Sequence, residues 1–136
     1  MVRFLVVEDD EAGSDALKEC LERIIGEGKV DVATDYQTAL GHVRNTPYDL
    51  YIVDGEFFTD PSCREVRCVG LDLMKEIIRK EGSAEKIRHM TANDGLIPKA
   101  EALGVTKIYR KGTPSGEYPK LLDILGEIRT EFGAGK

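Results

Sequence analysis

Several residue types and patterns are scarce or missing in this chain, and each scarcity excludes a class of protein. Its 136 residues include no tryptophan, only three cysteines and 7% aromatic residues. No apolar run approaches the length of a membrane-spanning helix, and the N-terminus lacks the pattern of a signal peptide, so we expect no membrane contact. Three unpatterned cysteines do not make a disulfide framework, which favours a reducing, cytoplasmic location.

Basic residues are too few for a nucleic-acid-binding face. The chain has 19 Lys and Arg against 25 Asp and Glu, a formal net charge of −6, so we expect no nucleic-acid partner. What is present is ordinary for a globular protein, with 41% hydrophobic and 32% charged residues. The length is enough for one domain with a buried core.

Segments with strand and helix periodicity alternate along the chain. Short apolar segments bounded by polar turns predict strands at 4–7, 30–32, 50–53, 87–90 and 107–110. Helical spacing predicts helices at 11–25, after a cap at Thr34 or Asp35, at about 71–80, from Pro98 to Gly104, and from Pro119 onward. Five βα units follow one another, and no change in composition marks a second domain. This predicts an α/β fold with a doubly wound parallel sheet in three layers.

Polar residues with a common chemistry follow four of these strands directly. Glu8 and Asp9 follow the first strand, Asp54 the third, Thr91 the fourth and Lys111 the fifth. In an open parallel sheet, ligands bind outside the carboxyl ends of the strands, so these side chains are expected to converge. Three carboxylates, a hydroxyl and an ammonium predict a site for a divalent metal and a phosphoryl group.

The order of these residues resembles the receiver domain of bacterial two-component response regulators, over roughly 2–131. In that family a phosphoacceptor Asp ends the third strand, where Asp54 lies, and an acidic pair that holds Mg²⁺ ends the first, where Glu8 and Asp9 lie. A Thr ends the fourth strand and a Lys the fifth, where Thr91 and Lys111 lie. The resemblance implies a flavodoxin-like, five-stranded parallel sheet of order 2-1-3-4-5, with five helices on two faces.

The same resemblance implies a role for each acidic residue. Asp54 would accept a phosphoryl group from a sensor histidine kinase or a phosphotransfer protein, in a Mg²⁺-dependent reaction. Asp9, Asp54 and the main-chain carbonyl of Glu56 would ligate the metal, with Glu8 in the outer shell.

Lys111 and Thr91 would hold the phosphoryl group, by charge and by a donated hydrogen bond. The domain would catalyse its own phosphorylation and dephosphorylation rather than turnover of an external substrate, so it is not expected to be an enzyme in the usual sense. It resembles a stand-alone receiver, because the chain ends where the receiver pattern ends. The output is then expected to be contact with an unknown downstream protein.

Two positions depart from the family pattern. The family follows its Lys with a proline in a cis peptide, whereas Lys111 precedes Gly112, and a cis bond without proline costs about 2.5–4 kcal/mol. The family's switch aromatic lies three residues before the Lys, where this chain has Ile108. Tyr109 is one place further on, which in a strand points its side chain to the opposite face, so a rotating-aromatic switch is not expected.

A segment over 56–69 is longer than its counterpart in the family and lies beside Asp54. It carries Phe57, Phe58, Cys63 and Cys68, and we expect it to fold over the site as an extended loop. The cysteines have no accompanying metal-ligand pattern. The receiver domain is expected over 1–131, with a flexible tail over 132–136.

Three further polar residues have structural interpretations. The acidic pair has an alternative role as the N-cap of the helix over 11–25, but Asp10 can cap that helix instead, which leaves the pair free for a metal. Arg88 and His89 are unusual in a strand that is expected to be central. His89 is predicted to be a hydrogen-bonded histidine at a strand end rather than a ligand.

Two alternative functions remain open. The first is a pseudo-receiver, the same fold acting as a phosphorylation-independent protein-binding module. The acceptor, the acidic pair, the Thr and the Lys argue against it, whereas Gly112, Ile108 and the long 56–69 segment keep it open. The second is a haloacid-dehalogenase-like phosphatase, another Mg²⁺-dependent family that forms an aspartyl phosphate. That family places its nucleophile on the first strand in an Asp-x-Asp pattern, whereas Asp54-Gly55-Glu56 follows the third.

Overall fold

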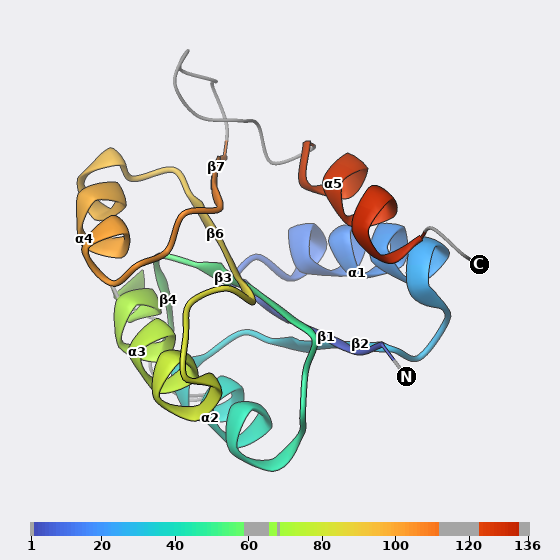
Figure 1. Cartoon of the computed structure of the whole chain (residues 1–136), viewed down its shortest axis with the longest axis horizontal. Coiled ribbons are helices and arrows are strands. Elements are labelled where there is room, and N and C mark those ends of the chain that lie inside the picture. Colours follow the sequence, from blue (N-terminus) through green and yellow to red (C-terminus); the bar gives the residue numbers. More distant parts are fainter. Residues whose placement is uncertain (1, 59–65, 68, 112–122, 134–136) are drawn as a thin grey trace.

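A five-stranded parallel sheet forms the centre of the molecule (Figure 1). The structure is a computed structural model that describes residues 2–58, 66–67, 69–111 and 123–133. The sheet has the order β2-β1-β3-β6-β7. Its strands are β1 (Phe4–Val7), β2 (Val30–Ala33), β3 (Leu50–Asp54), β6 (Ile87–Thr91) and β7 (Ile108–Arg110). Counted within this sheet alone, the order is 2-1-3-4-5 with all neighbours parallel, as predicted.

Helices cover both faces of this sheet (Figure 1). One face carries α1 (Glu11–Ile25) and α5 (Asp123–Phe132). The other carries α2 (Tyr36–Asn45), α3 (Gly70–Glu81) and α4 (Ile97–Ala102), with the short 3₁₀ helix η1 (Asp94–Leu96) before α4. The prediction of a doubly wound α/β fold with five helices is therefore confirmed.

Alternating side chains along each strand supply two separate hydrophobic cores. In β1, Phe4 and Val6 pack towards α1 and α5, whereas Leu5 and Val7 pack towards α2, α3 and α4. All four are fully buried. Strands that are covered on both faces read as continuous apolar runs, which is why the sequence predicted them clearly.

The helix boundaries differ from the predicted ones by one or two residues. Helix α3 includes one residue more at each end than the predicted 71–80, and α4 ends at Ala102 rather than at Gly104. Asp35 is the N-cap of α2, where its Oδ1 accepts a hydrogen bond of 2.7 Å from the Thr38 amide. The residues around Pro119 lie outside the described ranges.

Asp10 does not cap α1 in the predicted way. It occupies the N-cap position, but its side chain makes no capping hydrogen bond. Its main-chain amide instead donates to Glu8 Oε1, at 3.3 Å. The residue before α1 therefore contributes to holding Glu8 rather than to satisfying the helix end.

The long segment after β3 contains a small antiparallel hairpin that the sequence did not predict. Its strands are β4 (Phe57–Phe58) and β5 (Val66–Arg67). Phe57 is fully buried in the core on the α2–α4 side, so its ring packs there and does not fold over the site. Burying an aromatic ring in the core lowers the free energy more than leaving it exposed over a loop, which explains why Phe57 packs there. The rest of the predicted loop, over 59–65 and at 68, lies outside the described residues. Cys63 and Cys68 lie outside the described residues.

The C-terminal helix is tied to the sheet at its end. Phe132 belongs to α5, and its ring contacts the Phe4 ring edge to face at a centroid distance of 5.0 Å. In the described ranges, no helix has the length and apolar character needed to cross a membrane.

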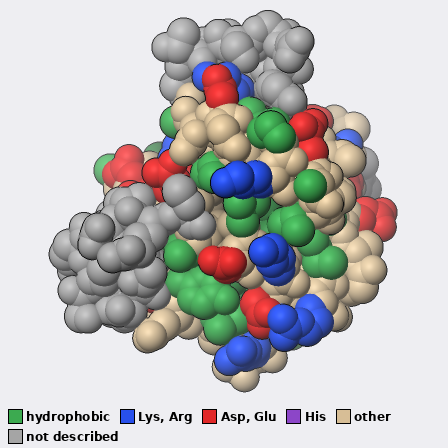
Figure 2. Space-filling view, turned by 90° about the vertical axis from the view of Figure 1, so that its left-hand side faces the viewer, with side chains coloured by type: hydrophobic (Ala, Val, Ile, Leu, Met, Phe, Trp, Pro, Cys, Tyr) green, Lys and Arg blue, Asp and Glu red, His purple; other side chains and the backbone are tan. Residues whose placement is uncertain are grey.

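The surface over α3 and α4 carries charges of both signs. Figure 2 shows that acidic and basic side chains alternate among hydrophobic ones on this side. The described part of this face therefore shows no broad basic surface of the kind that binds nucleic acid.

Candidate functional site

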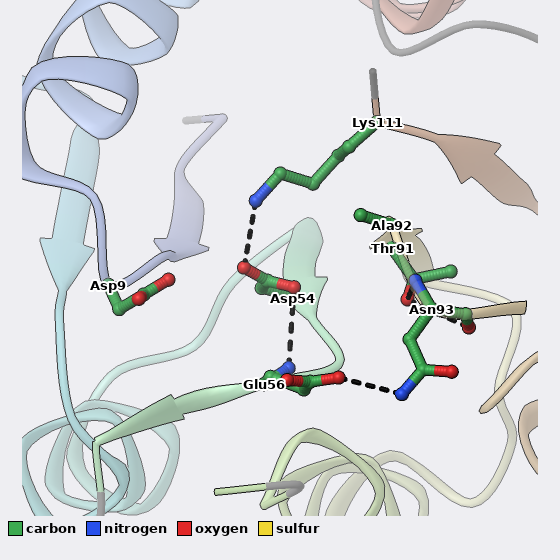
Figure 3. Close-up of a pocket in the computed structure, with 7 residues that line it drawn as sticks. All are labelled: Asp9, Asp54, Glu56, Thr91, Ala92, Asn93 and Lys111. Carbon is green, nitrogen blue, oxygen red and sulfur yellow. Dashed lines mark hydrogen bonds and ion pairs between the residues drawn. The ribbon is translucent and has the colours of Figure 1, made fainter. Parts of the chain in front are cut away.

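A pocket of about 250 Å³ opens at the carboxyl end of the sheet (Figure 3). It is lined by residues from the ends of β1, β3, β6 and β7: Asp9, Asp54, Glu56, Thr91, Ala92, Asn93 and Lys111. The strand ends meet here because the strands are parallel and neighbouring. The structure thus brings together the residues that the sequence predicted to converge, with Glu8 directly beside them.

Lys111 links the two buried carboxylates of the site. Its Nζ donates to Glu8 Oε2 at 2.7 Å and to Asp54 Oδ2 at 3.0 Å. The side chains of Glu8 and Asp54 are only 6% and 7% exposed, against 26% for Lys111. Burial would lower the pKa of Lys111, but the hydrogen bond to Glu8 and the charge of Asp54 outweigh it, and the pKa is raised.

Among the described residues, three carboxylates lie around this one ammonium. Glu8, Asp9 and Asp54 each offer an oxygen, and these oxygens lie within 4.8 Å of one another. Burial, followed by the neighbouring Asp54, raises the pKa of Glu8. Burial, followed by the neighbouring Glu8, raises the pKa of Asp9. The described part of the site therefore has more negative charge than Lys111 neutralises, which is a favourable environment for an added cation.

Thr91 lies in the pocket with its hydroxyl engaged in a local turn. Its Oγ1 donates to the Asn93 carbonyl at 3.2 Å and accepts from the Asn93 amide at 2.9 Å. The Thr91 carbonyl accepts from the Lys111 amide at 2.9 Å, which aligns the ends of β6 and β7. Thr91 is thus close to Asp54 but makes no hydrogen bond to it among those of the described residues.

Glu56 and Asn93 close one side of the entrance, as Figure 3 shows. The Asn93 Nδ2 donates to Glu56 Oε1 at 2.8 Å, and the Glu56 amide donates to Asp54 Oδ1 at 3.3 Å. The sequence predicts the main-chain carbonyl of Glu56 as a metal ligand and its side chain near the site entrance, where it lies, but it predicts no role for Asn93. A signal for Asn93 was present, because Asn is a preferred helix N-cap and its Oδ1 accepts from Gly95 at the start of η1.

Two glycines let α3 begin directly against the turn that follows Asp54. The Gly70 amide donates to the Gly55 carbonyl at 3.1 Å. A Cβ on Gly70 would collide with the Asp54 carbonyl oxygen and would lie 2.7 Å from the Gly55 Cα. Only glycine permits this approach, which holds the start of α3 against the backbone of Asp54 and Gly55.

Solved structures of receiver domains match this architecture over nearly its whole length. The non-phosphorylated HemR receiver domain from Leptospira biflexa is 24% identical, with a TM-score of 0.70, and the match covers 100% of this chain and 98% of that one. A CheY-like receiver domain protein from Methanospirillum hungatei is 20% identical, with a TM-score of 0.70, covering 97% and 94%. This chain has the receiver-domain fold.

A further match is the response regulator TrrA from Thermotoga maritima, solved in complex with Mg²⁺-BeF. It is 24% identical, with a TM-score of 0.65, and the match covers 97% of this chain and 99% of that one. No protein-family model matches the chain, and no curated protein matches it. The receiver-domain fold is therefore established by structure, whereas the role of each residue rests on the site itself.

The positions that depart from the family pattern can be placed within this receiver-domain fold. Ile108 belongs to the core on the α2–α4 side, and Tyr109 is buried against α1 and α5. The two side chains thus occupy opposite faces, as the strand register predicted. Burial, followed by a hydrogen bond to Glu127, raises the pKa of Tyr109. The peptide bond between Lys111 and Gly112 lies outside the described residues.

Proposed function

We propose that this protein is a phosphorylation-dependent signalling switch of the two-component type. Asp54 accepts a phosphoryl group from a sensor histidine kinase or a phosphotransfer protein, and the reaction depends on Mg²⁺. The observation that carries the proposal is the position of the Asp54 carboxylate, which lies at the base of an open pocket between Lys111 and two further carboxylates.

The donor set fits a magnesium ion. Mg²⁺ prefers oxygen ligands and retains several waters, so one or two carboxylates and a phosphoryl oxygen suit it. Asp9 and Asp54, with the Glu56 carbonyl, are the proposed ligands. Glu8 has its oxygens on Lys111 and the Asp10 amide, which suits the outer shell. When bound, the ion supplies positive charge to the attacking carboxylate and the phosphoryl oxygens. TrrA, with the same fold, was solved with Mg²⁺-BeF.

The transfer step forms one bond and breaks one. An Asp54 carboxylate oxygen attacks phosphorus in line, and the bond between phosphorus and the donor's imidazole nitrogen breaks. The imidazole, protonated on its other ring nitrogen, leaves as a neutral group. Asp54 reacts as an anion and needs no base, so positioning and charge neutralisation provide the catalysis. Lys111 has three N–H donors and can extend one to a phosphoryl oxygen while it stays on Glu8.

Thr91 connects the phosphoryl group to the surface. In the proposed switch its hydroxyl moves its donated hydrogen bond from the Asn93 carbonyl to a phosphoryl oxygen. Because Asn93 also caps η1, this exchange would shift the segment before α4. Output would then be contact between this altered surface and a downstream protein. Hydrolysis of the acyl phosphate by water would restore the resting arrangement.

The test is the intact mass of the protein after incubation with Mg²⁺ and acetyl phosphate. We expect the gain of a single phosphoryl group, which is absent in Asp54→Ala and absent when the metal is chelated. Asp10→Ala is the matched control, because Asp10 lies near the site but outside the proposed ligand set, and it should be phosphorylated. No modification of the wild type, or modification that persists in Asp54→Ala, would contradict the proposal and favour the phosphorylation-independent binding module.

A further inference from the structure

His89 is a polar side chain in the middle of β6 that the proposed chemistry does not use. It is fully buried and pairs with Val53 of β3 in the sheet. Because side chains alternate along a strand, His89 lies on the same face as Thr91, two residues further on. We had expected a histidine at a strand end with its hydrogen bonds satisfied, so both its place and its environment differ from the prediction.

The hydrogen bonding of His89 defines its tautomer. Nδ1 lies 3.1 Å from the carbonyl oxygen of Val53. A carbonyl oxygen only accepts, so Nδ1 carries the proton. Burial lowers the pKa of His89, which keeps the ring neutral and leaves Nε2 without a proton. Nε2 is buried and has no hydrogen-bond partner among the described residues.

The ring also lies beneath the turn that follows Asp54. A Cβ added to Gly55 would be 3.1 Å from His89 Cε1 and 3.4 Å from Thr91 Oγ1. His89 is therefore hydrogen-bonded to the carbonyl of the residue before the acceptor, and its ring lies next to Gly55, the residue after the acceptor.

We propose that His89 is a positioning residue for Asp54, whose ring fixes the direction in which the carboxylate enters the pocket. This role rests on the proposed phosphoryl acceptance by Asp54. A buried acceptor without a donor is unfavourable, so an apolar residue of similar size would suit this position better if it served stability alone. A histidine at this position donates to the Val53 carbonyl and fits beneath Gly55, and its second ring nitrogen, Nε2, is left without a partner among the described residues as a result.

Two substitutions separate positioning from packing. His89→Asn retains an N–H donor close to the place of Nδ1 and removes Nε2. His89→Leu fills the space with an apolar side chain and removes the donor to Val53. The initial rate of phosphorylation by acetyl phosphate with Mg²⁺ is measured for both by intact mass, and stability is measured as the urea midpoint of unfolding.

We expect His89→Leu to unfold at a urea midpoint no lower than the wild type, yet to be phosphorylated about tenfold more slowly, since small displacements of a reacting group cost rate. His89→Asn should stay within about twofold of the wild-type rate, because it keeps the donor. A purely structural residue would show no such separation of rate from stability. In addition, the imidazole ¹⁵N spectrum of the wild type should show one neutral tautomer with the proton on Nδ1.

The outcomes are distinct. If the wild type gains no phosphoryl group, the proposed function itself is contradicted. If the wild type is phosphorylated and His89→Leu matches its rate, only the role of His89 is overturned. An equal loss of rate in both variants, a fall in the urea midpoint of His89→Leu that parallels its loss of rate, or a proton on Nε2 would overturn that role as well.

Discussion

The two ends of the central sheet differ in how their carboxylates are neutralised. At the amino end, Asp31 and Glu81 each have a basic side chain and a tyrosine hydroxyl of their own. Asp31 accepts from Arg3 Nε at 3.2 Å and from the Tyr48 hydroxyl at 2.6 Å. Glu81 accepts from the Tyr51 hydroxyl at 2.7 Å and from Lys86 at 3.0 Å. At the carboxyl end, within the described residues, Glu8 and Asp54 share Lys111, and Asp9 lies beside them as a third carboxylate.

The pKa shifts follow this difference in partners. Burial would raise the pKa of Asp31 and of Glu81, but their hydrogen-bond and ion-pair partners outweigh it, so both pKa values are lowered. Burial also acts on Glu8 and Asp9, and there the neighbouring carboxylates add to it, so both pKa values are raised. The amino end thus uses charge to stabilise the fold. The carboxyl end holds charge that is unfavourable until a cation arrives, which is typical of a functional site.

The largest expected effect concerns the amino end. Arg88 is buried in β6, where it donates to the Glu85 carbonyl at 2.8 Å and to Glu131 of α5 at 3.1 Å. Arg88→Ala should lower the free energy of unfolding by about 2–3 kcal/mol, through lost charged hydrogen bonds and lost packing of the aliphatic stem. Glu131→Ala is the control, and its 53% exposed side chain should cost less than about 1 kcal/mol. Equal costs in urea unfolding would refute this view of Arg88.

The next effect concerns the carboxyl end, where stability is expected to depend on a bound cation rather than on ion pairs within the protein. At tenfold excess over its dissociation constant, Mg²⁺ should raise the free energy of unfolding by about 1.4 kcal/mol. Asp9→Asn should abolish that gain, and Glu8→Gln should reduce it less, because Glu8 is the proposed outer-shell residue. Urea unfolding with and without Mg²⁺ measures both. Asp10→Asn should respond as the wild type does, and an equal response in Asp9→Asn would remove Asp9 from the ligand set.

The smallest effect is the pH dependence in metal-free buffer. Because the pKa values of Glu8 and Asp9 are raised on folding, the native state binds their protons more tightly than the unfolded state does. Their contribution to stability is therefore full below the ordinary values of 4.5 and 3.8, and it is lost as the pH rises through the raised values. Removing one of these carboxyl groups should flatten that decline. A Glu8→Gln variant whose urea midpoint falls as steeply with pH above 4.5 as the wild type would contradict the assignment.

Strand ends were the most predictable part of this molecule. Apolar runs buried on both faces give a strong local signal, and parallel strands bring the residues after them together without further information. For that reason Asp9, Asp54, Thr91 and Lys111 could be expected in one pocket from the sequence, and the structure places them there.

Contacts between elements that are distant in sequence were less predictable. The hydrogen bond between Glu56 and Asn93 joins residues 37 apart, and the bond from His89 to Val53 joins residues 36 apart. Neither leaves a periodic signal, because each depends on how two strands or loops are placed in three dimensions. The hairpin that begins with Phe57 was not predicted either. Its two strands are only two residues long each, which is too short to leave an alternating pattern in the sequence.

The most direct test of Asp54 at the carboxyl end of the sheet as the phosphoryl acceptor is chemical trapping of the acyl phosphate. Protein treated with acetyl phosphate and Mg²⁺ is reduced with borohydride, which converts an aspartyl phosphate to homoserine, and the peptides are sequenced by mass spectrometry. We expect homoserine at position 54 alone, and none without Mg²⁺. Homoserine at any other carboxylate, or none in a protein that remains folded, would contradict the role of Asp54.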